Sequence, residues 1–203
     1  MLAAIVLAYG VIIALADAVA GSVVRLALLG YLLGEAVQLG GRARAWSRLA
    51  AAIGSGLALI VVTVVASVAS AVTTSGVVGG VSLAFTAAVI AILTRAVIAR
   101  RTVDTPVVLG VLSVYLLLAL FFASLNQLLA AFHPNGYLDG VAGLPSAADQ
   151  LYFSVVTMAT VGFGDVTPAS QVARAVTVVE ALAGQLYLVS VVAAVVGVWR
   201  RSP

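Results

Sequence analysis

The chain contains no cysteine, no lysine and only one histidine, His133, in 203 residues. Without cysteine it can form no disulfide, no thiolate metal site and no cysteine nucleophile. A single histidine cannot build a multi-histidine metal site, and the absence of lysine excludes a phosphate-binding loop that depends on one. No G-x-S-x-G elbow accompanies the serines, as a hydrolase of that type requires. These absences indicate that the protein is not an enzyme.

Charged residues are also scarce, whereas apolar residues are abundant. Only 8% of the residues are charged and 64% are hydrophobic, with a mean hydropathy of +1.24. This composition is typical of a chain that lies mostly in lipid. All ten basic residues are arginine and most of them lie between or after apolar runs, so the net charge of +3 reflects membrane topology. We expect an integral membrane protein surrounded by the lipid bilayer, with no nucleic acid partner.

Long apolar runs predict the membrane spans, each of which needs about 20 residues as a helix. Four runs reach or approach this length: 49–72, 77–99, 106–131 and 171–199. Residues 1–39 as one helix would be about 58 Å long, nearly twice the hydrocarbon thickness. A break at 17–22 gives two short spans instead, at 2–16 and 23–38. The sequence therefore predicts an all-α integral membrane protein with six transmembrane helices.

The arginines orient these spans, because cytoplasmic loops are enriched in positive charge. Six alternating spans place all three arginine groups on the cytoplasmic side: 42–48, 95–101 and 200–201. A single long first helix gives the same sidedness, so this rule leaves five and six spans both open. A third interpretation is a cleaved signal peptide over residues 1–20, because the A-V-A at 18–20 resembles a cleavage site. The absence of a basic residue before the apolar core argues against it.

Arg95, Arg100 and Arg101 do not have the spacing of a voltage sensor. Voltage sensors place an arginine at every third residue through the membrane, so that charge moves across the field. Here the spacings are five and one, and all three arginines lie near the cytoplasmic end of the run 77–99. We expect residues 1–105 to form a four-helix N-terminal transmembrane domain that is not a voltage sensor.

A short helix is predicted between the last two long spans. Residues 132–145 are rich in Gly, Pro, Asn and Asp, as expected of an extracellular loop, here called the turret. Ser146 and Asp149 then have the spacing of a capping box. The helix they begin, over 146–159, is too short to cross the bilayer and fits a re-entrant helix packed inside protein. Its carboxyl end carries a partial negative charge that favours a nearby cation.

The most specific sequence is T-M-A-T-V-G-F-G-D-V-T-P, over residues 157–168. Gly162 and Gly164 alternate with apolar residues. Glycine adopts the left-handed conformation without a Cβ clash. We therefore expect left-handed backbone at the two glycines.

The hexapeptide T-V-G-F-G-D resembles the selectivity filter of potassium channels, and we call these residues, 160–165, the filter loop. The order of elements around it is similar to their pore domain, over residues 106–203: outer helix 106–131, turret 132–145, pore helix 146–159, filter loop 160–165 and inner helix 168–199. The upstream half resembles small bacterial ion channels with four added helices.

The resemblance implies a homotetramer, since each chain supplies one loop and four loops surround the ion. It implies no cofactor, with potassium as the permeant ion bound at four successive carbonyl groups: Thr160, Val161, Gly162 and Phe163. Gly164 completes the filter loop and Asp165 lies at its outer mouth. The mouth then faces the extracellular side of the cell membrane, and the C-terminus of this multi-pass protein is cytoplasmic.

Tyr152 and Phe163 are the aromatic residues that bear on the stability of the filter loop. Phe163 replaces the tyrosine more common in this motif, so no hydroxyl ties this position to the pore helix. Tyr152 can instead donate a hydrogen bond to Asp165. We interpret Tyr152 as a support of the filter loop, together with Thr157.

Glu180 is a further candidate support, because an acidic residue in the middle of a membrane helix is costly and often functional. We expect it to face the pore helix or the outer helix and not the ion path. It is then either a brace behind the filter loop or a purely structural hydrogen-bonding group. The expected partners are Thr157, Ser154 and Ser124.

The inner helix carries two further signals. Thr167 and Pro168 have the pattern of an N-cap and a first-turn proline, so this helix is predicted over 168–199. Gly184 lies where potassium channels often have a hinge glycine. The alternative is a small residue that allows close helix packing.

These observations predict a potassium-selective channel that conducts passively. Two alternatives stay open. A weakly selective cation channel would follow from a filter loop loosened by Phe163 and Ala159. A non-conducting regulatory membrane subunit would keep the pore fold without its own ion flux.

Overall fold

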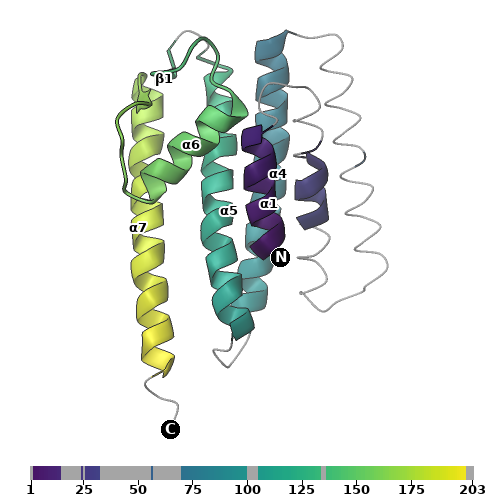
Figure 1. Ribbon diagram of the computed structural model, residues 1–203, viewed down its shortest axis with the longest axis vertical. Coiled ribbons are helices and arrows are strands. Elements are labelled where there is room, and N and C mark those ends of the chain that lie inside the picture. Colours follow the sequence, from purple (N-terminus) through teal and green to yellow (C-terminus); the bar gives the residue numbers. More distant parts are fainter. Residues whose placement is uncertain are drawn as a thin grey trace.

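The protein is described by a computed structural model for residues 2–14, 24, 26–32, 56, 70–99, 105–133 and 136–199. Within these ranges the chain consists of helices, two short strands and the loops that connect them (Figure 1). The helices are α1 (Leu2–Ala14), α4 (Ala71–Ile98), α5 (Thr105–Ala130), α6 (Ala147–Met158) and α7 (Gln171–Trp199), and the strands are β1 (Leu138–Asp139) and β2 (Thr167–Pro168).

Three of the described helices are long and apolar enough to cross a membrane, as expected: α4, α5 and the part of α7 over Gln171–Val191. The protein is therefore an all-α, multi-pass membrane protein. With 13 residues, α1 is about 20 Å long, which is too short for a span. The six predicted spans are thus not found in the described residues. Half of the span expected at 23–38 and most of the span expected at 49–72 lie outside them, as do most of the arginines used for orientation.

Glycines bring α4 and α5 into direct backbone contact. A Cβ atom added at Gly79 would lie 2.7 Å from the backbone nitrogen of Leu128, and one at Gly76 would lie 2.8 Å from the Cβ of Ala131. Small residues allow such close approach between membrane helices. Gln127 Nε2 also donates a hydrogen bond to Ser75 Oγ at 3.3 Å. The outer helix α5 is thereby held along α4 (Figure 1).

The N-terminal helix α1 packs against both α5 and α6. Tyr9 donates a hydrogen bond from its hydroxyl to the carbonyl oxygen of Leu116 at 2.7 Å. A shared apolar core joins α1, α4, α5 and α6 and includes the buried residues Ile5, Ile12, Val89, Leu93, Leu117 and Leu151. The N-terminal part of the chain therefore contacts the predicted pore helix directly.

The predicted capping box of the short helix α6 is confirmed. Ser146 Oγ accepts a hydrogen bond from the backbone nitrogen of Asp149 at 3.2 Å, and Asp149 Oδ2 accepts one from the backbone nitrogen of Ser146 at 2.8 Å. The helix runs from Ala147 to Met158, close to the predicted range of 146–159. It lies obliquely between α5 and α7 at one end of the molecule (Figure 1).

The predicted start of the inner helix was wrong. Thr167 and Pro168 are not its N-cap and first turn, because they form β2 and pair antiparallel with β1 of the turret. Ala169 also donates its backbone N–H to the carbonyl oxygen of Tyr137 at 3.1 Å. The helix begins at Gln171, after Ser170, whose Oγ accepts a hydrogen bond from the backbone nitrogen of Ala173 at 3.0 Å. Serine is a strong N-cap residue, and the pairing with the turret occupies the preceding residues.

A methyl group at Gly79 is expected to destabilise the α4–α5 contact. The added Cβ would meet the backbone of Leu128, which cannot yield as a side chain can, so Gly79→Ala should cost about 1–3 kcal/mol. Gly80→Ala is the matched control, since its Cβ would lie at an ordinary 3.7 Å from Leu128 Cδ1. Thermal denaturation in detergent measures both. A Gly79→Ala protein as stable as Gly80→Ala would contradict this packing.

Candidate functional site

The backbone of the filter loop alternates in handedness. The φ angle is positive at Thr160 (56°), Gly162 (57°) and Gly164 (80°), and it is not positive at the residues between them. The left-handed conformation expected at the two glycines is therefore observed. Thr160 was not expected to adopt it, and a positive φ is unusual for a β-branched residue. This strained residue begins the stretch in which the carbonyl direction alternates.

Hydrogen bonds fix the start of the filter loop to the last turn of α6. The backbone nitrogens of Thr160 and Val161 donate to the carbonyl oxygens of Thr157 and Val156, both at 3.0 Å. The backbone nitrogen of Gly162 lies 3.4 Å from the same oxygen of Val156. None of the described residues donates a hydrogen bond to the carbonyl oxygens of 160–163. The loop thus uses its first N–H groups internally and leaves a run of carbonyl acceptors free.

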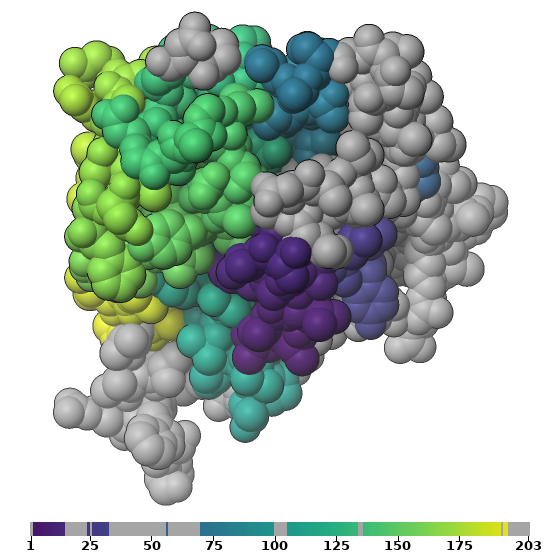
Figure 2. All heavy atoms as spheres, turned by 45° about the horizontal axis from the view of Figure 1, so that its top comes forward, coloured from purple at the N-terminus to yellow at the C-terminus, as the bar shows by residue number. Residues whose placement is uncertain are grey.

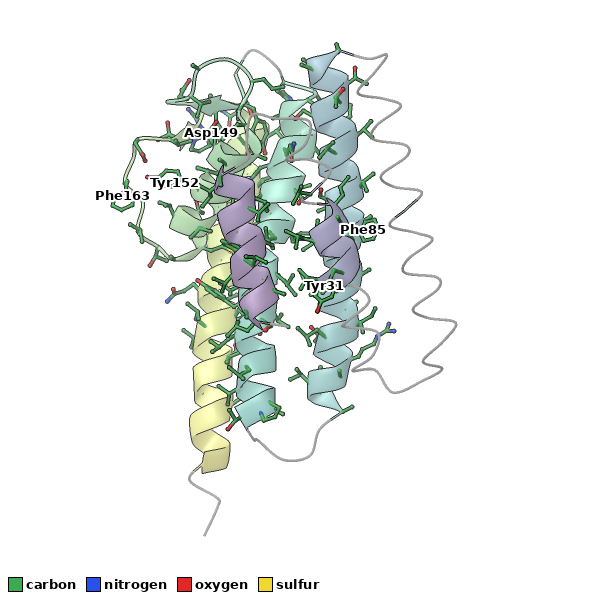
Figure 3. All side chains as sticks on the ribbon, turned by 45° about the vertical axis from the view of Figure 1, so that its right-hand side comes forward. Tyr31, Phe85, Asp149, Tyr152 and Phe163 are labelled. Carbon is green, nitrogen blue, oxygen red and sulfur yellow. The ribbon has the colours of Figure 1, made fainter. Side chains whose placement is uncertain are left out.

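The apolar side chains of the filter loop are exposed in the single chain. Val161 is 51% and Phe163 is 69% exposed. Figure 2 shows the corresponding yellow-green part of the chain at the edge of the molecule, beside the green pore helix and turret. The Phe163 ring is parallel to the Tyr152 ring, with centroids 6.4 Å apart and an interplanar angle of 5° (Figure 3). Stacking therefore connects Phe163 to α6 in place of a hydroxyl.

The predicted hydrogen bond between Tyr152 and Asp165 is confirmed. The Tyr152 hydroxyl donates to Asp165 Oδ2 at 2.7 Å. This hydrogen bond lowers the pKa of the Asp165 carboxyl below its ordinary value and raises the pKa of Tyr152. The outer end of the filter loop is therefore tied to α6 and carries an ionised carboxylate.

The turret packs closely against the outer end of the filter loop, at Asp165. Gly140 has a φ of +87°, and a Cβ at this position would clash with the carbonyl oxygen of Asp165. Only glycine fits this contact, which lies next to the pairing of β1 with β2. Sequence reasoning missed it, although the pair Asp139-Gly140 is a turn signal. Through it, the segment before α6 and the segment after the filter loop are held together.

A cavity of about 460 Å³ lies beside the filter loop and is lined by α6, the loop itself, β2 and α7. Its lining includes Thr157, which was predicted to support the filter loop, together with Val156, Thr160, Gly162, Thr177 and Ala181. Thr157 therefore lies on this cavity, and it forms no hydrogen bond with Glu180 among the described contacts. It contributes its backbone carbonyl to Thr160, whereas no hydrogen bond of its hydroxyl to another described residue is found.

Glu180 is fully buried and faces the outer and pore helices, as predicted. Asn126 Nδ2 lies 3.3 Å from both Glu180 Oε2 and Ser154 Oγ. The Tyr137 hydroxyl donates to Asn126 Oδ1 at 2.7 Å. Of the expected partners only Ser154 belongs to this cluster, because Ser124 Oγ donates to the carbonyl oxygen of Leu120 in its own helix. Asn126 was missed, although it is a polar residue within a predicted membrane span.

Gly184 packs against the end of α6. A Cβ at this position would lie 3.0 Å from the carbonyl oxygen of Met158 and 3.2 Å from its Cα. The Tyr115 hydroxyl donates to the same carbonyl oxygen at 3.2 Å. Of the two interpretations of Gly184, the structure therefore favours close helix packing.

Removal of the Tyr152 hydroxyl is expected to raise the pKa of Asp165 toward its ordinary value. The carboxylate accepts this hydrogen bond, so its contribution to stability is present above the ordinary pKa and is lost as the pH falls through the lowered one. Carbon-13 NMR titration of aspartate-labelled protein measures the shift in Tyr152→Phe. Tyr31→Phe, at an exposed tyrosine away from the filter loop (Figure 3), is the control. An unchanged Asp165 titration in Tyr152→Phe would show that the contact has no electrostatic effect.

Gly140→Ala is expected to open the contact between turret and filter loop. Gly143→Ala is a matched control, because Gly143 is also left-handed, with φ +74°, but its added Cβ would meet nothing within 4 Å. The control should lose only the conformational cost of about 1–2 kcal/mol. Gly140→Ala should lose more, with faster hydrogen exchange at the Ala169 amide that bonds Tyr137. Equal losses of stability in the two variants would rule out the clash.

Residues 110–201 match the family model described as "Ion channel". The matched segment includes most of α5, the turret, α6, the filter loop and α7, a little under half of the chain. No curated protein and no solved structure matches the chain. The C-terminal part of the chain is therefore similar in sequence to an ion channel domain, and it holds a short helix and a loop between two membrane-length helices.

Proposed function

We propose that this protein conducts potassium ions passively across the membrane, through a pore formed by four identical subunits. The observation that carries this proposal is the alternating backbone of the filter loop, with positive φ at Thr160, Gly162 and Gly164. Such alternation turns successive carbonyl oxygens toward one axis, where they replace the water around an ion. The carbonyl oxygens of 160–163 have no hydrogen-bond donor among the described residues, so they are free for this role.

Charge near the filter loop supports a cation as the permeant species. The carboxyl end of α6 precedes the loop directly and carries the negative end of the helix dipole. At the other end, the hydrogen bond from Tyr152 keeps Asp165 ionised. In this proposal Thr160, Val161, Gly162 and Phe163 bind potassium through their carbonyl groups, and Asp165 attracts cations to the outer mouth.

Exposed apolar side chains support a tetramer of this chain. Each chain has one filter loop, and a ring of loops is needed to surround an ion. Five large apolar residues of α7 are 57% to 63% exposed in the single chain: Val178, Val179, Leu182, Leu186 and Val189. With Val161 and Phe163 they lie on the two segments that must approach the pore axis. We infer that copies of this chain cover them.

In the membrane arrangement proposed here, the filter mouth lies outside the cell and the C-terminus lies in the cytoplasm. Residues 1–105 form the N-terminal domain, which carries no voltage sensor. Its described part contacts the pore domain through α1, which packs on α5 and α6, and through α4, which packs along α5.

Ion flux into liposomes tests the proposed function. Purified protein should carry potassium in preference to sodium, and barium should block the flux. Gly162→Ala should lower potassium flux by an order of magnitude or more, because alanine costs about 1–2 kcal/mol in the left-handed region in each of the four loops. Gly136→Ala is the matched control, since this turret glycine is exposed and its Cβ would meet nothing within 4 Å.

Other results separate the alternatives. Equal potassium and sodium flux would favour a weakly selective cation channel, in which the exposed Phe163 leaves the filter loop less rigid. Absence of flux from a correctly assembled protein would favour a non-conducting subunit. Flux that Gly162→Ala leaves unchanged would overturn the role of the filter loop.

A further inference from the structure

A buried polar cluster of Tyr137, Asn126, Ser154 and Glu180 joins four parts of the pore domain. Tyr137 belongs to the turret, Asn126 to α5, Ser154 to α6 and Glu180 to α7. All four side chains are at most 1% exposed. Asn126 contacts the other three: its Oδ1 accepts from the Tyr137 hydroxyl at 2.7 Å, and its Nδ2 lies 3.3 Å from both Ser154 Oγ and Glu180 Oε2. The cluster is therefore centred on Asn126.

The surroundings of Glu180 suit the uncharged acid. Its Oε1 has no hydrogen-bond partner, and the described groups that its carboxyl contacts are both neutral: the Asn126 amide, 3.3 Å from Oε2, and the Ser154 hydroxyl. The groups that face it are Asn126 from α5, Ser154 from α6 and, through Asn126, Tyr137 from the turret. Neither described arginine pairs with it, since Arg174 contacts the carbonyl oxygen of Pro168 and Arg95 lies in the last turn of α4. A buried carboxylate without a cation is strongly unfavourable.

The position of the cluster connects it to the filter loop. Ser154 lies one helical turn before Met158 on α6, and Glu180 lies one turn before Gly184 on α7. The two helices thus meet at two successive levels: through Asn126 at the first and by the contact of Gly184 with Met158 at the second. Between these levels Val156 holds the filter loop through its carbonyl oxygen. A shift of α6 against α7 would therefore move the loop itself.

We propose that Asn126 is a positioning residue for ion conduction: it sets α6 against α7 by bridging Ser154 and the uncharged Glu180, and so fixes the filter loop. The inference rests on the proposed function and adds to it a residue that touches no ion. Tyr137 orients the amide from the turret side.

Exchanging the amide of Asn126 and the acid of Glu180 tests whether Asn126 bridges Ser154 and Glu180. Asn126→Asp keeps the shape but places two carboxyl groups together, so potassium flux should fall by an order of magnitude or more at neutral pH. The flux should recover on acidification, when both groups carry a proton. Glu180→Gln should conduct nearly as the unaltered protein does, because an amide replaces an uncharged acid. The double variant Asn126→Asp with Glu180→Gln restores one amide and one acid, and most of the flux should return.

Ser124→Ala is the control, because Ser124 is buried on the same helix but bonds only its own helix backbone. A side chain that merely fills space would tolerate Asn126→Asp at every pH and show no rescue in the double variant. Either of these results would overturn the inference, as would a Glu180→Gln protein that does not conduct.

The melting temperatures of the same proteins separate this inference from the proposed function. An unaltered protein that assembles yet carries no ion would overturn the proposed function alone. In that case the inference about Asn126 still predicts that Asn126→Asp lowers the melting temperature and that the double variant restores it. Failure of that recovery in a conducting protein would overturn only the inference about Asn126.

Discussion

The structure depends on one constraint: a loop with unpaired carbonyl groups cannot face lipid, where no water satisfies them. The filter loop has such carbonyl groups, and α6, which carries it, is too short to cross the bilayer. Both must therefore be enclosed by protein. Within one chain α5, α7, α1 and the turret supply part of the enclosure. In the proposed tetramer, other subunits would cover the exposed faces of α7 and of the filter loop and so supply the remaining part.

Local signals were sufficient for several features of the site. The capping box at Ser146 and Asp149 depends on residues three positions apart, and the left-handed glycines depend on the absence of a Cβ atom. The hydrogen bond between Tyr152 and Asp165 followed from the family resemblance. Features that depend on distant residues were wrong or missed. Pro168 has the local pattern of a helix start, but it pairs with Leu138, and the Asn126–Glu180 contact spans 54 positions.

Tyrosine hydroxyls connect the helices of the protein in a consistent way. Tyr9 of α1 donates to the carbonyl oxygen of Leu116, Tyr187 of α7 to that of Val111, and Tyr115 of α5 to that of Met158. Each contact joins two helices through a backbone acceptor, which exists whatever the side chain at that position. A carbonyl oxygen has two lone pairs and can accept this second donor within a helix. These contacts give the apolar packing a defined register.

The pairing of β1 with β2 has a further consequence for the chain as a polymer. It brings together residues 138 and 168, so that the turret, α6 and the filter loop between them form a closed loop. Once the ends of such a segment are joined, fewer disordered conformations are available to its interior. A substitution that separates Gly140 from Asp165 would therefore act on the conformational entropy of the segment that contains the filter loop. A substitution at Gly140 would do so from the turret, without altering any residue of the filter loop.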